Sequence, residues 1–401
     1  MAKGKDEALP ADAARMPLGE DYPEIRDAIR AICAGYPATY WRQVEDQDTY
    51  PEAFVAELTR SGYLAALIPE EYGGSGLPLR AGSVILEEIH ASGCNAGACH
   101  AQMYIMGTLL RHGSAEQKRR YLPEIAAGRL RLQAFGVTEP TTGSDTTKLK
   151  TRAVRKGDRY IVNGQKVWTS RALQSDLMLL LARTTPVDEV KRKTEGLSVF
   201  LVDMREARAA GGMVVRKLQT MINHQTTEVF FDDVAVPAEN IIGEEGKGFR
   251  YILDGLNAER ILVASECIGD ARFFIRKGVN YAKERIVFDR PIGQNQAIQF
   301  PIARSYAEMR AADLMNRAAA ALFDAGQPCG EEANMAKLLA SEASWHAAEA
   351  ALQTHGGFGY AREYDVERKW RETRIFQIAP ISTNLILSYL GEHVLGMPRS
   401  Y

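Results

Sequence analysis

The stretch QAFGVTEPTTGSDTTKL, residues 133–149, concentrates side-chain hydroxyl groups in one short segment. Thr138, Thr142 and Ser144 share it with a glycine, Gly143. Hydroxyl and backbone N–H groups of a loop can bind a phosphate or the polar edge of a heteroaromatic ring. A loop that is simply solvated explains the same composition. The residues alone therefore leave a cofactor site and a solvated loop both open.

A second polar group follows in the run DRYIVNGQKVWTS, which ends in Trp168, Thr169 and Ser170. In the middle of this run, Asn163 and Gly164 stand between two stretches of strand-forming residues. An Asn-Gly pair in that setting is the strongest short-range signal of a β-hairpin. We therefore expect a hairpin turn at Asn163–Gly164, with the aromatic ring and two hydroxyl groups carried on it.

A carboxylate stands on an expected apolar helix face in the segment GLNAERILVA. Glu259 lies seven residues after Ile252, three after Leu256 and four before Val263, so all four share one face of a helix. A carboxylate that faces a core needs a compensating role. It could act as a general base towards a weakly acidic proton. A structural ion pair with an arginine is the alternative.

Nucleotide and metal motifs are largely missing from the sequence. No GxGxxG opens a helix after a strand, no GxxxxGK[ST] occurs, and GGSG (73–76) and GGFG (356–359) are typical of ordinary turns. No HExxH occurs, and His224 and His355 taken singly suit polar loop or core positions better than metal ligands. The five cysteines are scattered without a CxxC pair, so we expect no metal site and no disulfide framework.

Composition and charge exclude several classes of partner. The 401 residues are 46% hydrophobic and 25% charged, as in a globular protein. A formal net charge of −2 gives no basic surface for nucleic acid or an anionic membrane. The acid-rich first 27 residues resemble neither a secretory signal nor a transit peptide, and the longest apolar run is too short to cross a bilayer. We expect a cytoplasmic protein without membrane insertion.

The elements that must position these residues change along the chain. We expect a helical domain over residues 1–133, a small antiparallel β domain over 134–244 and a helical domain over 245–401. In the first, Ser114 and Gln117 have the spacing of a capping box. The last contains long helical patterns near 296–325 and 331–355, and Pro380 interrupts its final stretch.

Four segments in this order, FGVTEPTTGSD, YIVNGQKVWTS, ERIVFDRPIGQNQAIQ and QTHGGFGY, closely resemble the acyl-CoA dehydrogenases. The resemblance runs from EEYGGSGLP near residue 70 to the last helix. It implies an α+β fold with an N-terminal helical domain, a middle antiparallel β domain and a C-terminal four-helix bundle. It also implies a homotetramer, a dimer of dimers, with FAD bound in an extended pose without a Rossmann fold.

The resemblance also implies where FAD is held. The resemblance implies that Trp168 packs against the isoalloxazine ring. Ser170 stands where relatives have a threonine that meets the N5 edge of the flavin. The ring and phosphates would contact Phe135, Val137, Thr138, Gly143, Ser144, Trp168, Thr169 and Ser170. The adenine half, bound by a neighbouring subunit, would contact Arg285, Phe288 and Gln296. Further cofactor contacts would come from Gln353, Gly356, Gly357, Ser382 and Asn384.

The family reaction converts an acyl-CoA thioester to the trans-2-enoyl-CoA, as a base removes the α proton and hydride passes to flavin N5. Most members carry the base in a loop resembling YEGTS, where this chain reads Ala379 to Thr383 with Pro380 at the glutamate position. Proline also lacks an N–H that could bind the thioester oxygen, a role that the N–H of Ile381 could take. Isovaleryl-CoA and long-chain acyl-CoA dehydrogenases keep their glutamate on an earlier helix, where Glu259 stands here.

The implied function is an FAD-dependent acyl-CoA dehydrogenase of fatty acid β-oxidation that passes electrons to an electron-transfer flavoprotein. Asn257, Arg260 and Ser144 would contact the acyl-CoA substrate, and the helix position of the base gives a weak preference for a branched or bulky acyl group. A flavin oxidase or monooxygenase on the same fold is one alternative. Pro380 motivates another, a catalytically silent subunit that binds FAD or acyl-CoA.

Overall fold

The computed structural model describes residues 19–399 and divides into two compact units. The sheet unit consists of Gly35–Gly82 and Asn95–Leu262. The helical unit consists of the described residues up to Ala34, Ser83–Cys94 and the segment from Val263 onward. The division between them passes through the long helix α8, Gly248–Glu284. Each unit is described by itself below.

An eight-stranded sheet forms the centre of the sheet unit, in the order β6-β7-β3-β2-β4-β5-β8, with β1 also paired to β4. Neighbouring strands are antiparallel, except that β4 runs parallel to β1 and to β2. The strands are β1 (Leu132–Gly136), β2 (Arg152–Lys156), β3 (Arg159–Ser170), β4 (Leu177–Arg183), β5 (Leu197–Asp203), β6 (Met213–Lys217), β7 (Thr226–Pro237) and β8 (Ile241–Ile242). Alternate side chains of β3 and β7, including Tyr160, Val162, Val229 and Val236, fill a core beside Phe200.

The expected hairpin turn at Asn163–Gly164 is wrong, because both residues lie inside β3. The turn instead lies at Gly157, with a φ of 63°, where Lys156 of β2 pairs with Arg159 of β3. Gly164 is required for a different reason. Its φ is 148°, the register against β7 shifts between Val162 and Gly164, and a Cβ there would lie 2.5 Å from the hydroxyl oxygen of Thr151. Gly164 is therefore required by a β-bulge and by the close approach of Thr151, and not by a turn.

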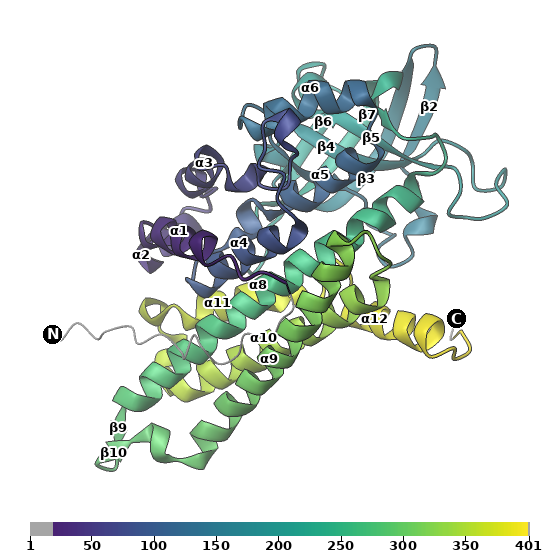
Figure 1. Ribbon diagram of the computed structural model, residues 1–401. Coiled ribbons are helices and arrows are strands. Elements are labelled where there is room, and N and C mark those ends of the chain that lie inside the picture. The colour runs from purple at the N-terminus through teal and green to yellow at the C-terminus, as the bar shows by residue number, and fades with distance from the viewer. Residues whose placement is uncertain (1–18, 400–401) are drawn as a thin grey trace. The chain divides into compact units, whose positions relative to one another are not determined.

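Helices cover this sheet and provide its connections. They are α2 (Ala38–Asp46), α3 (Glu52–Arg60), α5 (His100–His112), α6 (Ala115–Ala126), α7 (Met204–Ala209) and the first part of α8. Helix α5 packs against β1 (Figure 1). The capping box that opens α6 is confirmed, since the Gln117 N–H donates to the Ser114 side chain and the Ser114 N–H donates to the Gln117 side chain.

The helical unit is built around α8, α9 (Gln296–Asp324) and α10 (Gly330–His355) (Figure 1). Helices α9 and α10 pack against each other, and a Cβ on Gly278 of α8 would lie 3.5 Å from the Ile302 side chain of α9 and 3.7 Å from Ala351 of α10. Both long helical patterns of the sequence therefore form the expected helices. The other elements are α1 (Pro23–Ala34), α4 (Leu79–Ala91), α11 (Val366–Thr373), α12 (Thr383–Tyr389) and the small hairpin of β9 (Ile286–Val287) and β10 (Arg290–Pro291). With helices before and after a central β segment, the predicted α+β fold class is confirmed.

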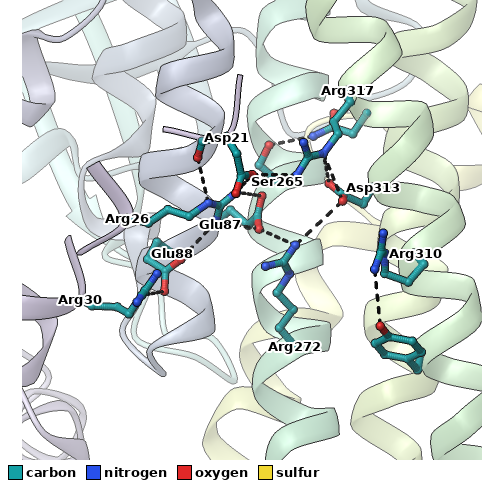
Figure 2. Close-up of polar contacts among 12 residues, drawn as sticks. Asp21, Arg26, Arg30, Glu87, Glu88, Ser265, Arg272, Arg310, Asp313 and Arg317 are labelled. Carbon is teal, nitrogen blue, oxygen red and sulfur yellow. Dashed lines mark hydrogen bonds and ion pairs between the residues drawn. The ribbon is translucent and has the colours of Figure 1, made fainter. Parts of the chain in front are cut away.

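Charged side chains join four helices of this unit in a buried network (Figure 2). Glu87 of α4 accepts a hydrogen bond from Nη1 of Arg26 on α1 and forms an ion pair with Arg272 of α8, each at 3.0 Å. Arg272 also lies 3.9 Å from the Asp313 carboxylate of α9, which in turn pairs with Arg317 of the same helix at 3.2 Å. Burial lowers the pKa of Arg26, but the Glu87 carboxylate more than offsets this, so that its pKa lies above the usual range.

Three further properties concern only residues 19–399. No helix in that range is long and apolar enough to span a bilayer. The same residues contain no cluster of three or more His, Cys, Asp and Glu side chains suited to a metal ion. All five cysteines lie in this range as buried, free thiols.

Candidate active site

The end of β3 presents an exposed aromatic ring. Trp168 is 62% exposed and has a φ of 61°, where the pairing of β3 with β7 is irregular between Lys166 and Thr169. This bulge turns Trp168 outward, and Ser170 is partly exposed. The side chain of Thr169, by contrast, is buried in the unit, and its carbonyl accepts a hydrogen bond from the Thr227 hydroxyl. Two of the three sequence-predicted residues of this strand therefore offer their side chains to a ligand.

The hydroxyl-rich loop lies beside this strand end. The Val167 N–H donates to the Thr138 carbonyl at 2.9 Å, which joins the loop to β3. Gly143 and Ser144 are exposed, and a Cβ built on Gly143 would meet no atom within 4 Å. Phe135 at the end of β1 is partly buried, as are Val137 and Thr138. The structure therefore brings the loop and the end of β3 together within the sheet unit.

A buried ion pair, which the sequence analysis missed, fixes that loop. The Lys166 ammonium group donates to the Glu139 carboxylate at 2.8 Å and to the Val137 carbonyl at 2.9 Å. The same carboxylate accepts hydrogen bonds from the backbone N–H groups of Lys150 and Thr151. Both charged side chains are almost fully buried. The sequence did contain one indication of this burial. Alternate residues of β3, counted from Tyr160, face inward, and Lys166 is one of them.

The environment of this pair shifts both pKa values. Burial lowers the pKa of Lys166 to about 8, although the adjacent Glu139 carboxylate opposes the shift. Burial raises the pKa of Glu139, but Lys166 and the backbone N–H donors outweigh that, and the net pKa lies below the usual range. Both groups are therefore predominantly charged at neutral pH. Neither can be removed without leaving the other charge buried alone.

Glu259 is buried on α8, with 5% of its surface exposed. Its expected position on a buried helix face is therefore confirmed. The adjacent Arg260 donates a hydrogen bond to the Asn257 side chain at 2.7 Å, which holds the two expected substrate contacts together. One turn earlier, a Cβ on Gly255 would lie 2.9 Å from the hydroxyl oxygen of Thr108 on α5. Helix α5 in turn packs against β1. The Glu259 carboxylate and the exposed Trp168 both belong to the sheet unit.

The remaining sequence-predicted cofactor residues lie in the helical unit. Phe288 at the β9–β10 hairpin is 92% exposed, and the Arg285 guanidinium lies 5.7 Å from the centre of the Phe358 ring. Gly356 and Gly357 precede that ring at the end of α10, and a Cβ on either would meet no atom within 4 Å. The hairpin and the glycine pair are thus neighbours. Gln296, at the start of α9, and Gln353, in the last turn of α10, are exposed.

Pro380 lies in the connection between α11 and α12, so the expected interruption of the last helical stretch is confirmed. The buried Lys337 ammonium group donates to the Ile381 carbonyl at 2.6 Å and anchors this connection. Ser382 caps α12 by accepting a hydrogen bond from the Leu385 N–H. Because it is a proline, Pro380 itself offers neither a carboxylate nor a backbone N–H.

Each unit has one surface that suits part of a dinucleotide. Each has an exposed aromatic ring, Trp168 in the sheet unit and Phe288 in the helical unit, that an apolar ring system would cover. Each also has exposed backbone at glycine, at Gly143 and at the pair Gly356–Gly357, where a phosphate can approach closely. Each surface, taken by itself, therefore offers the two kinds of group that part of a dinucleotide needs, an exposed ring and open glycine backbone.

Comparison with known sequences decides the family. The sequence model of the acyl-CoA dehydrogenase N-terminal domain matches residues 19–129, that of the middle domain 134–234, and that of the C-terminal domain 246–394. The chain belongs to the acyl-CoA dehydrogenase family. It is therefore an FAD-dependent oxidoreductase, and the acyl-CoA dehydrogenase resemblance of its four motifs is confirmed.

Relatives cover nearly the whole of this acyl-CoA dehydrogenase. It is 34% identical over 385 residues to acyl-CoA dehydrogenase FadE12 of Mycobacterium tuberculosis, which covers 95% of this chain and 98% of that protein. It is 35% identical over 344 residues to the caffeyl-CoA reductase-Etf complex subunit CarC of Acetobacterium woodii, covering 84% and 88%. The structure of butyryl-CoA dehydrogenase from Megasphaera elsdenii matches with a TM-score of 0.88 and 28% identity, covering 95% and 100%.

Proposed function

We propose that this acyl-CoA dehydrogenase oxidises the Cα–Cβ bond of an acyl-CoA thioester to the trans-2-enoyl-CoA, with Glu259 as the base that removes the α proton. One observation carries the proposal. Glu259 is a buried carboxylate on α8, in the same unit as the exposed Trp168, while the usual loop position is taken by Pro380. A buried carboxylate has a high desolvation cost, and a catalytic role explains why it is retained.

The residues of the chain would divide the work as follows. The Glu259 carboxylate would accept the α proton, and its burial would keep water from competing for that proton. Asn257 and Arg260, held together by their hydrogen bond, would contact the CoA portion with Ser144. Trp168 and Ser170 would orient the ring system of the cofactor. When bound, FAD supplies the acceptor for the hydride that leaves Cβ.

We assign the oxidative direction and an electron-transfer flavoprotein as the electron acceptor. FadE12, which aligns over 95% of this chain, is named a dehydrogenase. CarC is named as part of a reductase–Etf complex, which supports a flavoprotein partner but also makes the reductive direction the outcome to exclude. The direction is decided by whether saturated or 2-enoyl thioesters react.

We also propose a homotetrameric assembly. The β9–β10 hairpin exposes the apolar side chains of Ile286, Val287 and Phe288, and such an apolar patch is typical of a surface that a second subunit covers. A dimer of dimers would place Arg285 and Phe288 against FAD bound to a neighbouring subunit. FAD binding would then stabilise the assembly by mass action.

Anaerobic mixing of the FAD-loaded protein with a panel of saturated acyl-CoA thioesters tests the proposed reaction. We expect loss of the oxidised flavin absorbance with at least one thioester, together with a product two hydrogen atoms lighter by mass spectrometry. Flavin that stays oxidised with every thioester would contradict the proposal. It would favour a silent binding subunit, the function that Pro380 makes the second candidate. Rapid peroxide formation in air would favour an oxidase.

A further inference from the structure

Directly after Ser170, Arg171 is buried without a carboxylate partner. It is 3% exposed and has a left-handed backbone conformation, with a φ of 59°. Its Nη1 donates to the Gly97 carbonyl and lies 3.1 Å from Nε2 of His224, while its Nη2 lies 3.4 Å from Nε2 of His100. Its Nε is buried and has no hydrogen-bond partner. Within residues 19–399, none of the contacts of this guanidinium is to an acidic side chain.

Two other buried arginines, Arg26 and Arg368, offer a comparison. Arg26 is paired with Glu87, and Arg368 donates to both Asp365 and Glu372. Such pairing is the rule, because a buried charge without a counter-charge is costly. The cluster of Arg171, His100 and His224 therefore carries a positive charge that the described chain does not neutralise.

The two histidines do not offset this charge, and they orient the guanidinium. Burial lowers the pKa of His224 well below its usual range, and the nearby charges of Arg171 and His100 lower it further. Neutral His224 can then accept a hydrogen bond from Arg171 through Nε2, which leaves its own proton on Nδ1. Gly97 packs closely against the His224 ring, since a Cβ at Gly97 would lie 2.9 Å from that ring. The Nε–Nη2 edge of Arg171 retains an unused donor at Nε.

The position of the cluster limits which anion it can bind. Arg171 follows Ser170, and consecutive Cα atoms are about 3.8 Å apart. In the proposed reaction the Cα–Cβ bond of the substrate lies at the cofactor edge that Ser170 would meet. The CoA phosphates are separated from that bond by the whole pantetheine arm, and the oxidised flavin ring is neutral. The anion within reach of Arg171 would thus belong to the acyl chain, a few bonds beyond Cβ.

We propose that Arg171 is a specificity residue that binds a carboxylate on the acyl chain, so that the substrate is a monothioester of a dicarboxylic acid. The inference rests on the proposed function, because it places the acyl chain beside Ser170. The side-on edge of a guanidinium binds a carboxylate through two parallel hydrogen bonds. The bound carboxylate supplies the missing counter-charge and the missing partner of Nε. His100 and His224 act as positioning residues that hold the guanidinium.

The test compares glutaryl-CoA and adipyl-CoA with valeryl-CoA and hexanoyl-CoA on the FAD-loaded protein. Two quantities are measured, kcat/KM and the equilibrium Kd of each thioester. We expect the wild-type protein to prefer the carboxylated thioesters by about 10- to 100-fold, the scale of a charge-assisted hydrogen-bonded pair. In Arg171→Met that ratio should fall to near unity in both quantities. Arg171→Lys should keep part of it, because the charge remains while the paired donors are lost.

The outcomes separate this inference from the proposed function. If uncharged thioesters react and bind as well as carboxylated ones, in the wild type and in Arg171→Met alike, the inference is wrong and the proposed reaction stands. If no thioester reduces the flavin, the proposed reaction fails, and the Kd ratios alone then decide whether Arg171 binds a carboxylate. If Arg171→Met does not retain FAD, the wild-type ratios and those of Arg171→Lys decide in the same way.

Discussion

At the scale of single residues, the buried pair of Lys166 and Glu139 determines how the hydroxyl-rich loop is held. Its three classes of contact, to a side chain, a carbonyl and two backbone N–H groups, leave the loop little freedom beside Trp168. The sequence showed both residues within the motifs that carry the family resemblance, but not their pairing. They are separated by 27 positions, and only the folded sheet brings them together.

Removing one member of this pair should be costly. We expect Lys166→Met to lower the free energy of unfolding by about 3–5 kcal/mol, because it leaves the Glu139 carboxylate buried and uncompensated. Lys148→Met is the matched control, since Lys148 also pairs with a carboxylate, that of Asp145, but at the surface. It should cost less than about 1 kcal/mol. Equal losses by chemical denaturation would show that the Lys166 pair does not anchor the loop.

His224 should make stability depend on pH. Because its pKa in the folded protein lies well below the usual value, the unfolded chain binds a proton near pH 6.5 that the folded chain does not. The free energy of unfolding should therefore fall as pH drops below about 6.5, by about 1.4 kcal/mol per pH unit for this one group. Denaturation at a series of pH values should show a shallower slope for His224→Gln than for the exposed control His346→Gln. Identical slopes of unfolding free energy against pH in the two variants would show that the pKa of His224 is not lowered in the folded protein.

At the scale of elements, helices were predictable from the sequence and the β3 strand was not. Helices α9 and α10 follow from apolar periodicity, and the start of α6 follows from Ser114 and Gln117, because these signals depend on neighbouring residues alone. Gly164 has the same local signal as a turn glycine. Its real constraint is the approach of Thr151 from a neighbouring segment, which no local pattern contains. The orientation of Trp168 depends likewise on a bulge against β7.

The glycine of β3 gives a direct test of that reading. We expect Gly164→Ala to lower the free energy of unfolding by about 1–3 kcal/mol, since alanine disfavours a φ of 148° and its Cβ would clash with Thr151. Gly157→Asn is the control, because Gly157 has a left-handed φ of 63° with open space around it, a conformation that asparagine tolerates. If Gly157→Asn lowers the free energy of unfolding more than Gly164→Ala does, the assignment of the turn to Gly157 and of the bulge to Gly164 is wrong.

At the scale of the whole molecule, each unit holds part of the residue set that the family resemblance assigns to the cofactor. The sheet unit holds Trp168, Ser170 and the proposed base, and the helical unit holds Arg285, Phe288 and the glycines after α10. The network in Figure 2 gives the helical unit its own internal connections, which run from α1 through Glu87 and Arg272 to Asp313 of α9. Sequence periodicity indicated the helices but gave no sign of which charges would be buried together.

Glu87 is the residue whose loss should damage that network most. It pairs with both Arg26 and Arg272, so Glu87→Gln removes one counter-charge from each, while Arg26 keeps Asp21 and Glu88. Because other carboxylates remain near both arginines, we expect a loss of about 1–3 kcal/mol in the free energy of unfolding, the scale of a lost buried hydrogen-bond partner. Asp27→Asn, which alters the exposed pair with Arg30, should cost less than about 1 kcal/mol. Comparable losses in the two variants would show that the network contributes no more than a surface pair.

The account as a whole depends on Glu259 as the base, and anaerobic stopped-flow measurement of flavin reduction in Glu259→Gln tests it most directly. The substitution keeps the size of the side chain and removes the proton acceptor. With the best acyl-CoA substrate, flavin reduction should slow by at least ~10², the scale of positioned general-base catalysis, while FAD content and thioester affinity stay close to those of the wild type. Flavin reduction at nearly the wild-type rate in Glu259→Gln would contradict the assignment and place the base elsewhere.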